Sequence, residues 1–267
     1  MMAGSRMRYF VAVFSGAVLL FLCLPIAIVV PMSFSSAQSL QFPPPGLSLR
    51  WYASFLGDSR WLNAAINSLV LAFVASTTAL VLGTLAAYAI VRGNLLGKRL
   101  IESNFVAPMI IPPIITAIAL YIFFAKTHIL GSFFGLAVAH TLLAAPYVVL
   151  LMSVAIQSFD IRIEQVALTL GASQFQMLVR VVMPNLAPSA LAAWIFAFII
   201  SFDEVVVTQF VAGRYFTIPK RMFNELVLQI NPTITAIATV LIAISVITIG
   251  IIALLMKRAG LLAPRQV

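Results

Sequence analysis

Charged side chains are scarce in this sequence, and their scarcity excludes a soluble globular protein. Only 9% of the residues are Asp, Glu, Lys or Arg, whereas a soluble domain carries about 25%. Hydrophobic residues make up 63% of the 267 positions, and the mean hydropathy is +1.11. These residues fall in long apolar runs, as in membrane-spanning helices. The composition therefore predicts an all-α integral membrane protein.

Cysteine and histidine are nearly absent as well. Cys23 is the single cysteine, so an intrachain disulfide is impossible. Two histidines and one cysteine leave no cluster with the spacing of a metal site. The chain has no Gly-x4-Gly-Lys-Ser/Thr loop to hold a nucleotide phosphate. We therefore expect no catalytic residues, no metal and no cofactor in this chain.

Six apolar runs predict six transmembrane helices in a single domain. The predicted spans are about 9–32, 64–91, 103–125, 133–156, 188–211 and 234–256. Ten of the Lys and Arg residues fall on the side of the two termini and six on the other side, which places both termini in the cytoplasm. Although the net charge is +9, the basic residues flank the apolar runs. That placement indicates contact with lipid headgroups rather than with nucleic acid.

Prolines and a histidine mark the two middle spans. Pro108 and the pair Pro112-Pro113 lie inside the third run and should break its helix, because proline donates no backbone hydrogen bond. A broken helix is poorly tolerated against lipid, so we expect this span to face the protein interior or a cavity. His140 lies in the fourth run. Such a histidine is more often hydrogen-bonded to a neighbouring helix than a ligand, and its functional role stays open.

A polar amphipathic segment of about 30 residues, 157–188, separates the fourth and fifth runs. Asp160 is placed to cap one short helix and Gly171 to end it. Ser173 and Gln176 have the spacing of a capping box for a second helix. Pro184 and Pro188 are then predicted to stop that helix and start the fifth span. From pattern alone, the segment is equally an ordinary amphipathic loop.

The same segment resembles the cytoplasmic loop of permease subunits of type I binding-protein-dependent ABC importers. Their signature is Glu-Ala-Ala, three residues, Gly, nine residues, then Ile-x-Leu-Pro. Here Ala167, Gly171 and Pro184 match in register, while Gln165 stands at the Glu position and Glu164 precedes it. The resemblance implies a coupling helix that docks on an ATPase subunit, with contacts from Glu164, Gln165, Ala167, Gly171, Ala172 and Pro184.

The resemblance also implies the surroundings of the chain. It predicts two ATPase subunits that bind ATP and Mg²⁺, a second six-span permease subunit and an extracytoplasmic solute-binding protein. It further implies a bacterial inner membrane as the location, with membrane lipid around the spans. The chain itself would be a passive translocation subunit worked from the cytosol through the loop between its fourth and fifth helices.

Asp203 and Glu204 are adjacent acidic residues inside the fifth apolar run. A carboxylate at mid-membrane costs about 3 kcal/mol on insertion scales, and no basic residue follows until Arg214. The partner is therefore a basic residue on another span, bound water or a cationic substrate. On a continuous helix, Glu204 shares a small polar face with Ser201 and Thr208, which predicts that this face lines the substrate pathway. Asp203 falls on a different, larger and more apolar face, which predicts a packed interface. The alternative is an ion pair that locks two helices together.

The stretch Ser201-Phe202-Asp203-Glu204-Val205-Val206-Val207 resembles the fifth span of spermidine/putrescine permeases. The resemblance implies that the acidic pair recognises a cationic polyamine, and related permeases leave another amine, an amino acid or an opine-like solute as alternatives. Two other classes remain in comparison. A proton-coupled secondary transporter would show an inverted repeat, which we do not find, and a membrane enzyme would need a convergent set of titratable groups.

Overall fold

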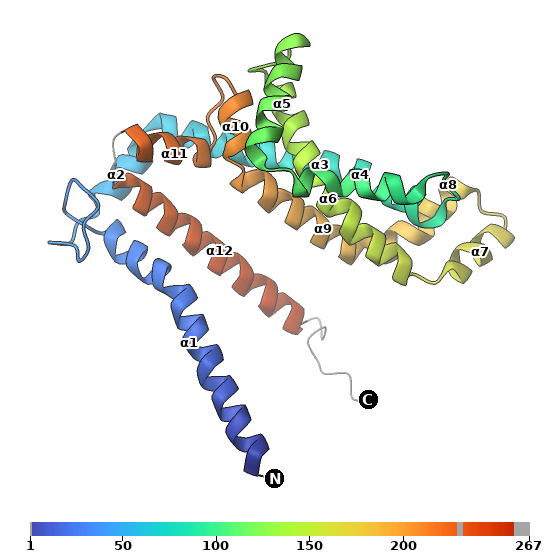
Figure 1. Cartoon of the computed structure of the whole chain (residues 1–267), viewed down its shortest axis with the longest axis horizontal. Coiled ribbons are helices and arrows are strands. Elements are labelled where there is room, and N and C mark those ends of the chain that lie inside the picture. The colour runs from blue at the N-terminus through green and yellow to red at the C-terminus, as the bar shows by residue number, and fades with distance from the viewer. Residues whose placement is uncertain (1, 229–231, 259–267) are drawn as a thin grey trace. The chain divides into compact units, whose positions relative to one another are not determined.

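The computed structural model describes residues 2–228 and 232–258, with side chains described for residues 7–227 and 232–247. All secondary-structure elements of these residues are helices, and no β-strand occurs among them. The chain divides into two compact units, one formed by residues 1–61 and 224–267 and the other by residues 62–223 (Figure 1). The candidate site lies wholly within the second unit.

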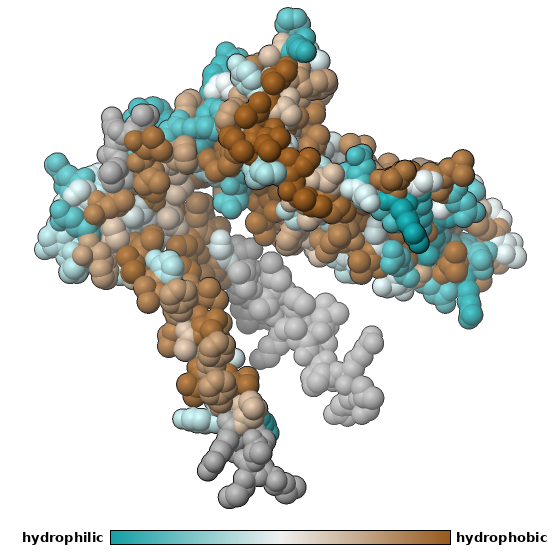
Figure 2. Space-filling model, viewed as in Figure 1, coloured by the Kyte–Doolittle hydropathy of each residue, from teal (hydrophilic) through white to brown (hydrophobic). Residues whose placement is uncertain are grey.

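The first unit contains α1 (Met2–Ser33), α2 (Arg50–Gly57) and α12 (Thr233–Arg258), and α12 contacts both α1 and α2. The loop before α2 folds back on itself. Its backbone pairs Ser36 with Gly46 over 2.9 Å, and the indole of Trp51 donates to the carbonyl oxygen of Ser35 over 2.9 Å. Apolar side chains cover much of α1 (Figure 2). Residues such as Phe21, which is 73% exposed, leave this helix suited to a hydrophobic environment.

The second unit is built on small residues that let its helices approach closely. It begins within α3 (Ser59–Arg92), and its other long helices are α6 (Phe133–Ser158) and α9 (Met183–Asp203). Ala79 and Ala87 of α3 are fully buried in one core cluster with residues of α6 and α9. A Cβ on Gly83 would come within 2.8 Å of the Val148 side chain. This packing of small side chains is typical of helices associating within membranes.

The predicted break in the third apolar run is confirmed. Helix α4 (Lys98–Ile110) ends before Pro112, α5 (Pro113–Lys126) begins at Pro113, and the two are bent by 104°. The cause is chemical, because neither proline has an N–H to donate to the preceding turn. The run is therefore two helices joined by a sharp bend, rather than one straight helix over 103–125. Pro108, which was also expected to break the helix, lies inside α4 instead.

The two short helices predicted after the fourth run are present, with the expected caps. In α7 (Ile161–Thr169) the Asp160 carboxylate accepts from the backbone N–H of Arg162, and Gly171 follows with φ +89°. In α8 (Gln174–Met177) Ser173 and Gln176 form the reciprocal capping box. Both helices therefore start where their capping residues dictate.

The prediction that Pro184 and Pro188 stop the second short helix is wrong. Helix α8 continues through a π-helix, η1 (Leu178–Val182), directly into α9, so helix runs unbroken from Gln174 to Asp203. The π-turn makes room for Pro184: the Met183 N–H donates to the carbonyl of Leu178, five residues back. The side-chain amide of Asn185 supplies a donor to the Val181 carbonyl over 2.7 Å. Pro188 then lies inside α9.

The fifth apolar run is also not one helix over 188–211. Helix α9 ends at Asp203, Glu204 is extended with φ −72° and ψ 118°, and α10 (Val206–Val211) resumes beyond it. The assignment of residues 201–208 to faces of a continuous helix therefore does not hold. After α10, the chain enters α11 (Ile218–Leu228).

Four helices of the described residues are long and apolar enough to cross a membrane: α1, α3, α6 and the continuous helix from Gln174 to Asp203. The bent pair α4 and α5 makes a fifth if it is counted as one broken span. The described apolar part of α12, Thr233–Ile247, is shorter. The count of six spans stays a prediction.

Candidate functional site

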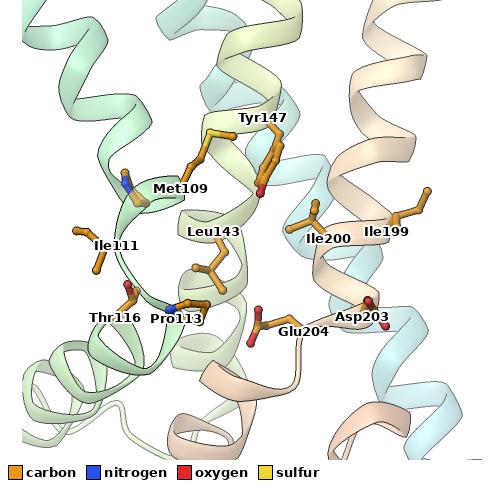
Figure 3. Close-up of a pocket in the computed structure, with 11 residues that line it drawn as sticks. Met109, Ile111, Pro113, Thr116, Leu143, Tyr147, Ile199, Ile200, Asp203 and Glu204 are labelled. Atoms are coloured by element: carbon orange, nitrogen blue, oxygen red, sulfur yellow. The ribbon is translucent and has the colours of Figure 1, made fainter.

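A cavity of about 250 Å³ opens where the two interrupted runs meet. One wall comes from the break between α4 and α5, another from α6, and the third from the end of α9 (Figure 3). The lining residues are Pro108, Met109, Ile111, Pro113, Thr116, Leu143, Tyr147, Ile199, Ile200, Asp203 and Glu204. The walls are thus mainly apolar, with both predicted acidic residues in the same cavity.

Glu204 is held by the break that it occupies. Its Oε1 accepts the backbone N–H of Val207 over 2.8 Å, so the carboxylate caps the first turn of α10. Figure 3 shows this side chain directed from the extended segment after α9 toward Leu143 and Pro113. The carboxylate therefore caps α10 and lines the cavity at the same time. Asp203 lines the cavity from the last turn of α9 and is exposed.

Neither acidic residue is neutralised by a cation of the described chain. Asp203 and Glu204 form no salt bridge within the described part of the chain, whereas Asp58 pairs with Arg60 and Glu164 with Arg92. The buried amine of Lys220 donates instead to the carbonyl oxygens of Gly213 and Tyr215, over 3.0 and 3.4 Å. Burial lowers the pKa of Lys220, since it disfavours the charged amine. Lys220 is thus occupied by backbone oxygens rather than by the carboxylates of the cavity.

Ser201 and Thr208, both predicted to line the pathway, lie in the interior instead. Ser201 is 3% exposed and Thr208 is fully buried. Their hydroxyl oxygens lie 2.8 and 2.9 Å from the two ring nitrogens of His140 on α6. The expectation that His140 is hydrogen-bonded to a neighbouring helix is confirmed, and it contacts helices on both sides of the break.

Glu164 does not offer its carboxylate to a partner protein, because it is buried and paired within the chain. It is 5% exposed, Arg92 bridges it over 2.8 Å, and the hydroxyl of Tyr88 donates to it over 2.8 Å. Arg92 also donates to the Phe159 carbonyl oxygen. These bonds tie α7 to the end of α3. Neither Tyr88 nor Arg92 was predicted to be functional. The only signal in the sequence was that Arg92 is a basic residue at the end of an apolar run.

The other predicted loop residues are at or near the surface. Gln165, Gly171 and Pro184 are exposed, while Ala167 and Ala172 are half-buried against the core. A groove of about 600 Å³ opens beside them, lined by α3, α7 and α8. Phe175 lines this groove and is 74% exposed, and Leu170 on the same segment is 82% exposed. Exposed apolar surface of this kind marks an interaction site for another protein or for the membrane.

Sequence reasoning missed the other half of the cavity. Thr116 and Tyr147 line it from α5 and α6, and the prolines of the broken run shape its wall. The prolines were recognised as helix breakers, but nothing in the sequence relates residues near 110 to residues near 203. That relation depends on how α4, α6 and α9 pack.

The chain belongs to the family of binding-protein-dependent transport system inner membrane components, which matches residues 79–261. It is therefore a permease subunit of an ABC importer. The spermidine/putrescine transport system permease protein PotC of Escherichia coli is 30% identical over 237 residues, covering 88% of this chain and 89% of PotC. The putrescine transport system permease protein PotI of the same organism is 33% identical over 248 residues, covering 90% and 88%.

Solved structures show the same fold. A bacterial ABC transporter involved in the import of the acidic polysaccharide alginate aligns with a TM-score of 0.70 at 17% identity, covering 96% of this chain and 97% of that one. The MetNI methionine ABC transporter, in an inward-facing conformation, aligns with a TM-score of 0.61 at 18% identity, covering 74% and 94%. The fold is that of a type I ABC importer permease.

Proposed function

We propose that this permease subunit forms half of the translocation pathway for a polyamine, and that the cavity at Asp203 and Glu204 receives it. The observation that carries the proposal is the state of Glu204: a partly buried carboxylate, directed into a cavity, without a cationic side chain bonded to it among the described residues. The names of PotC and PotI, which are transport proteins for spermidine and putrescine, support the same substrate class.

The chemistry of the cavity suits a molecule with several ammonium groups. Two adjacent carboxylates neutralise two positive charges, while apolar residues such as Leu143 and Ile200 contact the methylene chain between them. Tyr147 offers an aromatic face, which attracts a cation by its quadrupole. An amino acid or an opine-like solute also carries a carboxylate, and no Lys or Arg lines the cavity to receive it. The lining therefore favours a polyamine over those alternatives.

Transport requires subunits that bind ATP, which we place outside this chain. The proposed complex has two ATPase subunits that hold ATP and Mg²⁺, a second six-span permease chain and an extracytoplasmic binding protein that delivers the polyamine. Six spans with both termini in the cytoplasm put residues 157–188 on the side of the ATPases. The exposed loop residues Gln165, Gly171 and Phe175 would dock there.

The ion pair of Glu164 and Arg92 gives the loop a rigid connection to the spans. When ATP closes the ATPases, the movement of α7 and α8 passes to α3 through this buried bridge. It passes to α9 through the continuous helix from Gln174 to Asp203, which ends at the cavity. Loop and cavity are thus joined by one helix, as a mechanical coupling requires.

The test is uptake by the whole importer in proteoliposomes. Glu204→Gln keeps an oxygen to cap α10 but removes the charge, so the variant should assemble normally. We expect the rate of labelled putrescine uptake to fall about tenfold or more, in line with the loss of one charge-assisted interaction. Substrate stimulation of ATP hydrolysis should weaken in parallel. Glu102→Gln, the same change at an exposed position of α4 that does not line the cavity, is the matched control and should leave uptake unchanged.

Competing solutes complete the test. Unlabelled spermidine should inhibit putrescine uptake, whereas an amino acid in equal excess should not. If Glu204→Gln transports putrescine with unchanged kinetics, Glu204 is structural and the proposed cavity is not the substrate site.

A further inference from the structure

His140 joins the two sides of the interruption that carries the acidic pair. Its Nδ1 lies 2.8 Å from the hydroxyl of Ser201, in the last turn of α9, and its Nε2 lies 2.9 Å from the hydroxyl of Thr208, in α10. All three side chains are buried. The imidazole ring thus bridges the helix ends on either side of Glu204. His140 does not line the cavity, whereas Glu204 does.

The direction of each hydrogen bond follows from a count of protons. Thr208 Oγ1 donates its single proton to the carbonyl oxygen of Glu204 over 2.9 Å, because a carbonyl only accepts. Thr208 must then accept from His140, which places the ring proton on Nε2. In the neutral ring Nδ1 is consequently an acceptor, so Ser201 donates to it.

The result is a directed chain from Ser201 through His140 and Thr208 to the backbone carbonyl of Glu204. Each buried polar atom of the chain has a partner, and each has the correct donor or acceptor role. A fully satisfied buried network favours one conformation, because any rearrangement leaves a polar group unpaired. The conformation that it favours here is the break itself, which aims Glu204 into the cavity.

We infer that His140 is a positioning residue for substrate recognition, which acts through Thr208 on the orientation of the Glu204 carboxylate. This inference rests on the proposed function of the cavity. His140 does not line the cavity. The inference is that cation binding in the cavity nevertheless depends on this neutral histidine.

The experiment measures binding of labelled putrescine to the whole importer trapped with ATP and vanadate, so that the affinity reports the cavity. Thr208→Val keeps the shape of the side chain but removes both of its hydrogen bonds. We expect the dissociation constant to rise about fivefold to tenfold, as for one lost hydrogen bond. Thr208→Ser restores the hydroxyl and should stay within about twofold of the parent protein.

Thr141→Val is the matched control. Thr141 follows His140 on α6 and donates to the carbonyl of Ala137 over 2.7 Å, so this change also removes a hydroxyl that bonds to its own helix. It does not touch the chain of hydrogen bonds to Glu204, and we expect putrescine binding to be unchanged. His140→Ala, which also leaves a cavity, is secondary to these variants.

A double-mutant cycle separates positioning from a general loss of structure. In a Glu204→Gln background, Thr208→Val should weaken binding by less than about twofold, because the charge that it orients is gone. Equal effects in both backgrounds, or an unchanged affinity in the single variant, would overturn the role of His140 and Thr208. If Glu204→Gln alone has no effect, the proposed function fails instead, so the two failures are distinguishable.

Discussion

Glu164 receives hydrogen bonds from Tyr88 and Arg92, while Glu204 caps the backbone of α10 and lines a cavity. Both are acidic residues within largely apolar surroundings. The first is fully compensated by the chain and serves to anchor α7. The second is left without a cation among the described residues, which is the property expected of a residue that binds a charged ligand.

Removing Arg92 should destabilise the subunit, since Glu164 would remain buried without a cation. We expect Arg92→Ala to lower the free energy of unfolding by about 3–5 kcal/mol, measured as a lower unfolding temperature of the purified complex. The double variant Arg92→Met with Glu164→Leu should recover much of the loss, because the uncompensated charge is gone. Arg162→Ala, an exposed arginine on α7, is the control. A single variant as stable as Arg162→Ala would contradict the anchor.

Gly131 and Gly213 separate two costs of adding a side chain to a glycine: the steric clash and the backbone strain. Gly213 and Gly131 both have positive φ, +53° and +72°, and lie against each other. A Cβ on Gly213 would come within 2.8 Å of the Cα of Gly131, whereas a Cβ on Gly131 would meet nothing closer than 3.7 Å. Gly131→Ala should therefore cost only the strain of about 1–2 kcal/mol. Gly213→Ala should cost clearly more, and thermal unfolding that ranks them equally would refute the clash.

At the residue scale, the sequence was informative where chemistry is local. The caps at Asp160, Ser173 and Gly171 and the breaks at proline follow from the donors that each backbone lacks. The acidic pair was singled out by its cost in a membrane. The burial of Glu164 was not predictable, because its partners lie on α3, far away along the chain.

Among elements, the interrupted helices are where the sequence reading failed. The run from Trp194 to Thr208 has no proline or glycine, so a continuous helix was the natural prediction. The break is specified instead by side chains that satisfy the exposed backbone: the Glu204 carboxylate caps α10, and Thr208 bonds the carbonyl of Glu204. Such a break depends on tertiary contacts with α6, which a single sequence does not show.

The π-turn before Pro184 offers a test of how loop and spans are connected. In Pro184→Ala the new N–H is free to donate to the Arg180 carbonyl, so the π-turn should convert to α-helix. The conversion turns α8 by about 100° relative to α9, which displaces Phe175. We expect unchanged or higher stability, since an interior proline costs about 3 kcal/mol. ATPase stimulation by the substrate-loaded binding protein should fall severalfold.

Pro188→Ala provides the comparison, because Pro188 lies inside α9 beyond the π-turn. This variant should keep the stimulation of ATP hydrolysis. If Pro184→Ala keeps full stimulation too, then the register of α8 does not matter for coupling.

For the molecule as a whole, composition sufficed to predict an all-helical membrane protein, because 9% charged residues cannot cover a water-facing surface. The family followed from a loop signature of a few residues, and the match over residues 79–261 supports it. The membrane topology is a separate matter. It rests on the distribution of Lys and Arg and on the count of spans, both of which remain predictions.

The single cysteine makes this topology testable. In a Cys23→Ser background, Ser39→Cys should react with a membrane-impermeant maleimide on intact cells. Gln174→Cys should react only after the membrane is permeabilised, because α8 is predicted to face the cytoplasm. Both positions are exposed, so a cysteine that fails to react is shielded by the membrane barrier rather than by burial in the protein. Labelling of Gln174→Cys on intact cells would show that α8 faces the exterior. That result would contradict the predicted topology and the proposed contact with the ATPase.

The sharp bend between α4 and α5 has a consequence for how the substrate site is mapped. Pro112 and Pro113 cannot donate to the carbonyls of Pro108 and Met109, four residues earlier, and all of these except Pro112 border the cavity. Main-chain oxygens of this kind are good acceptors for ammonium groups. Alanine scanning leaves them untouched, so it would not detect a contribution of these oxygens to binding. Replacing both prolines would restore the N–H groups but would also remove the cause of the bend, so such a variant tests the shape of the cavity together with these oxygens.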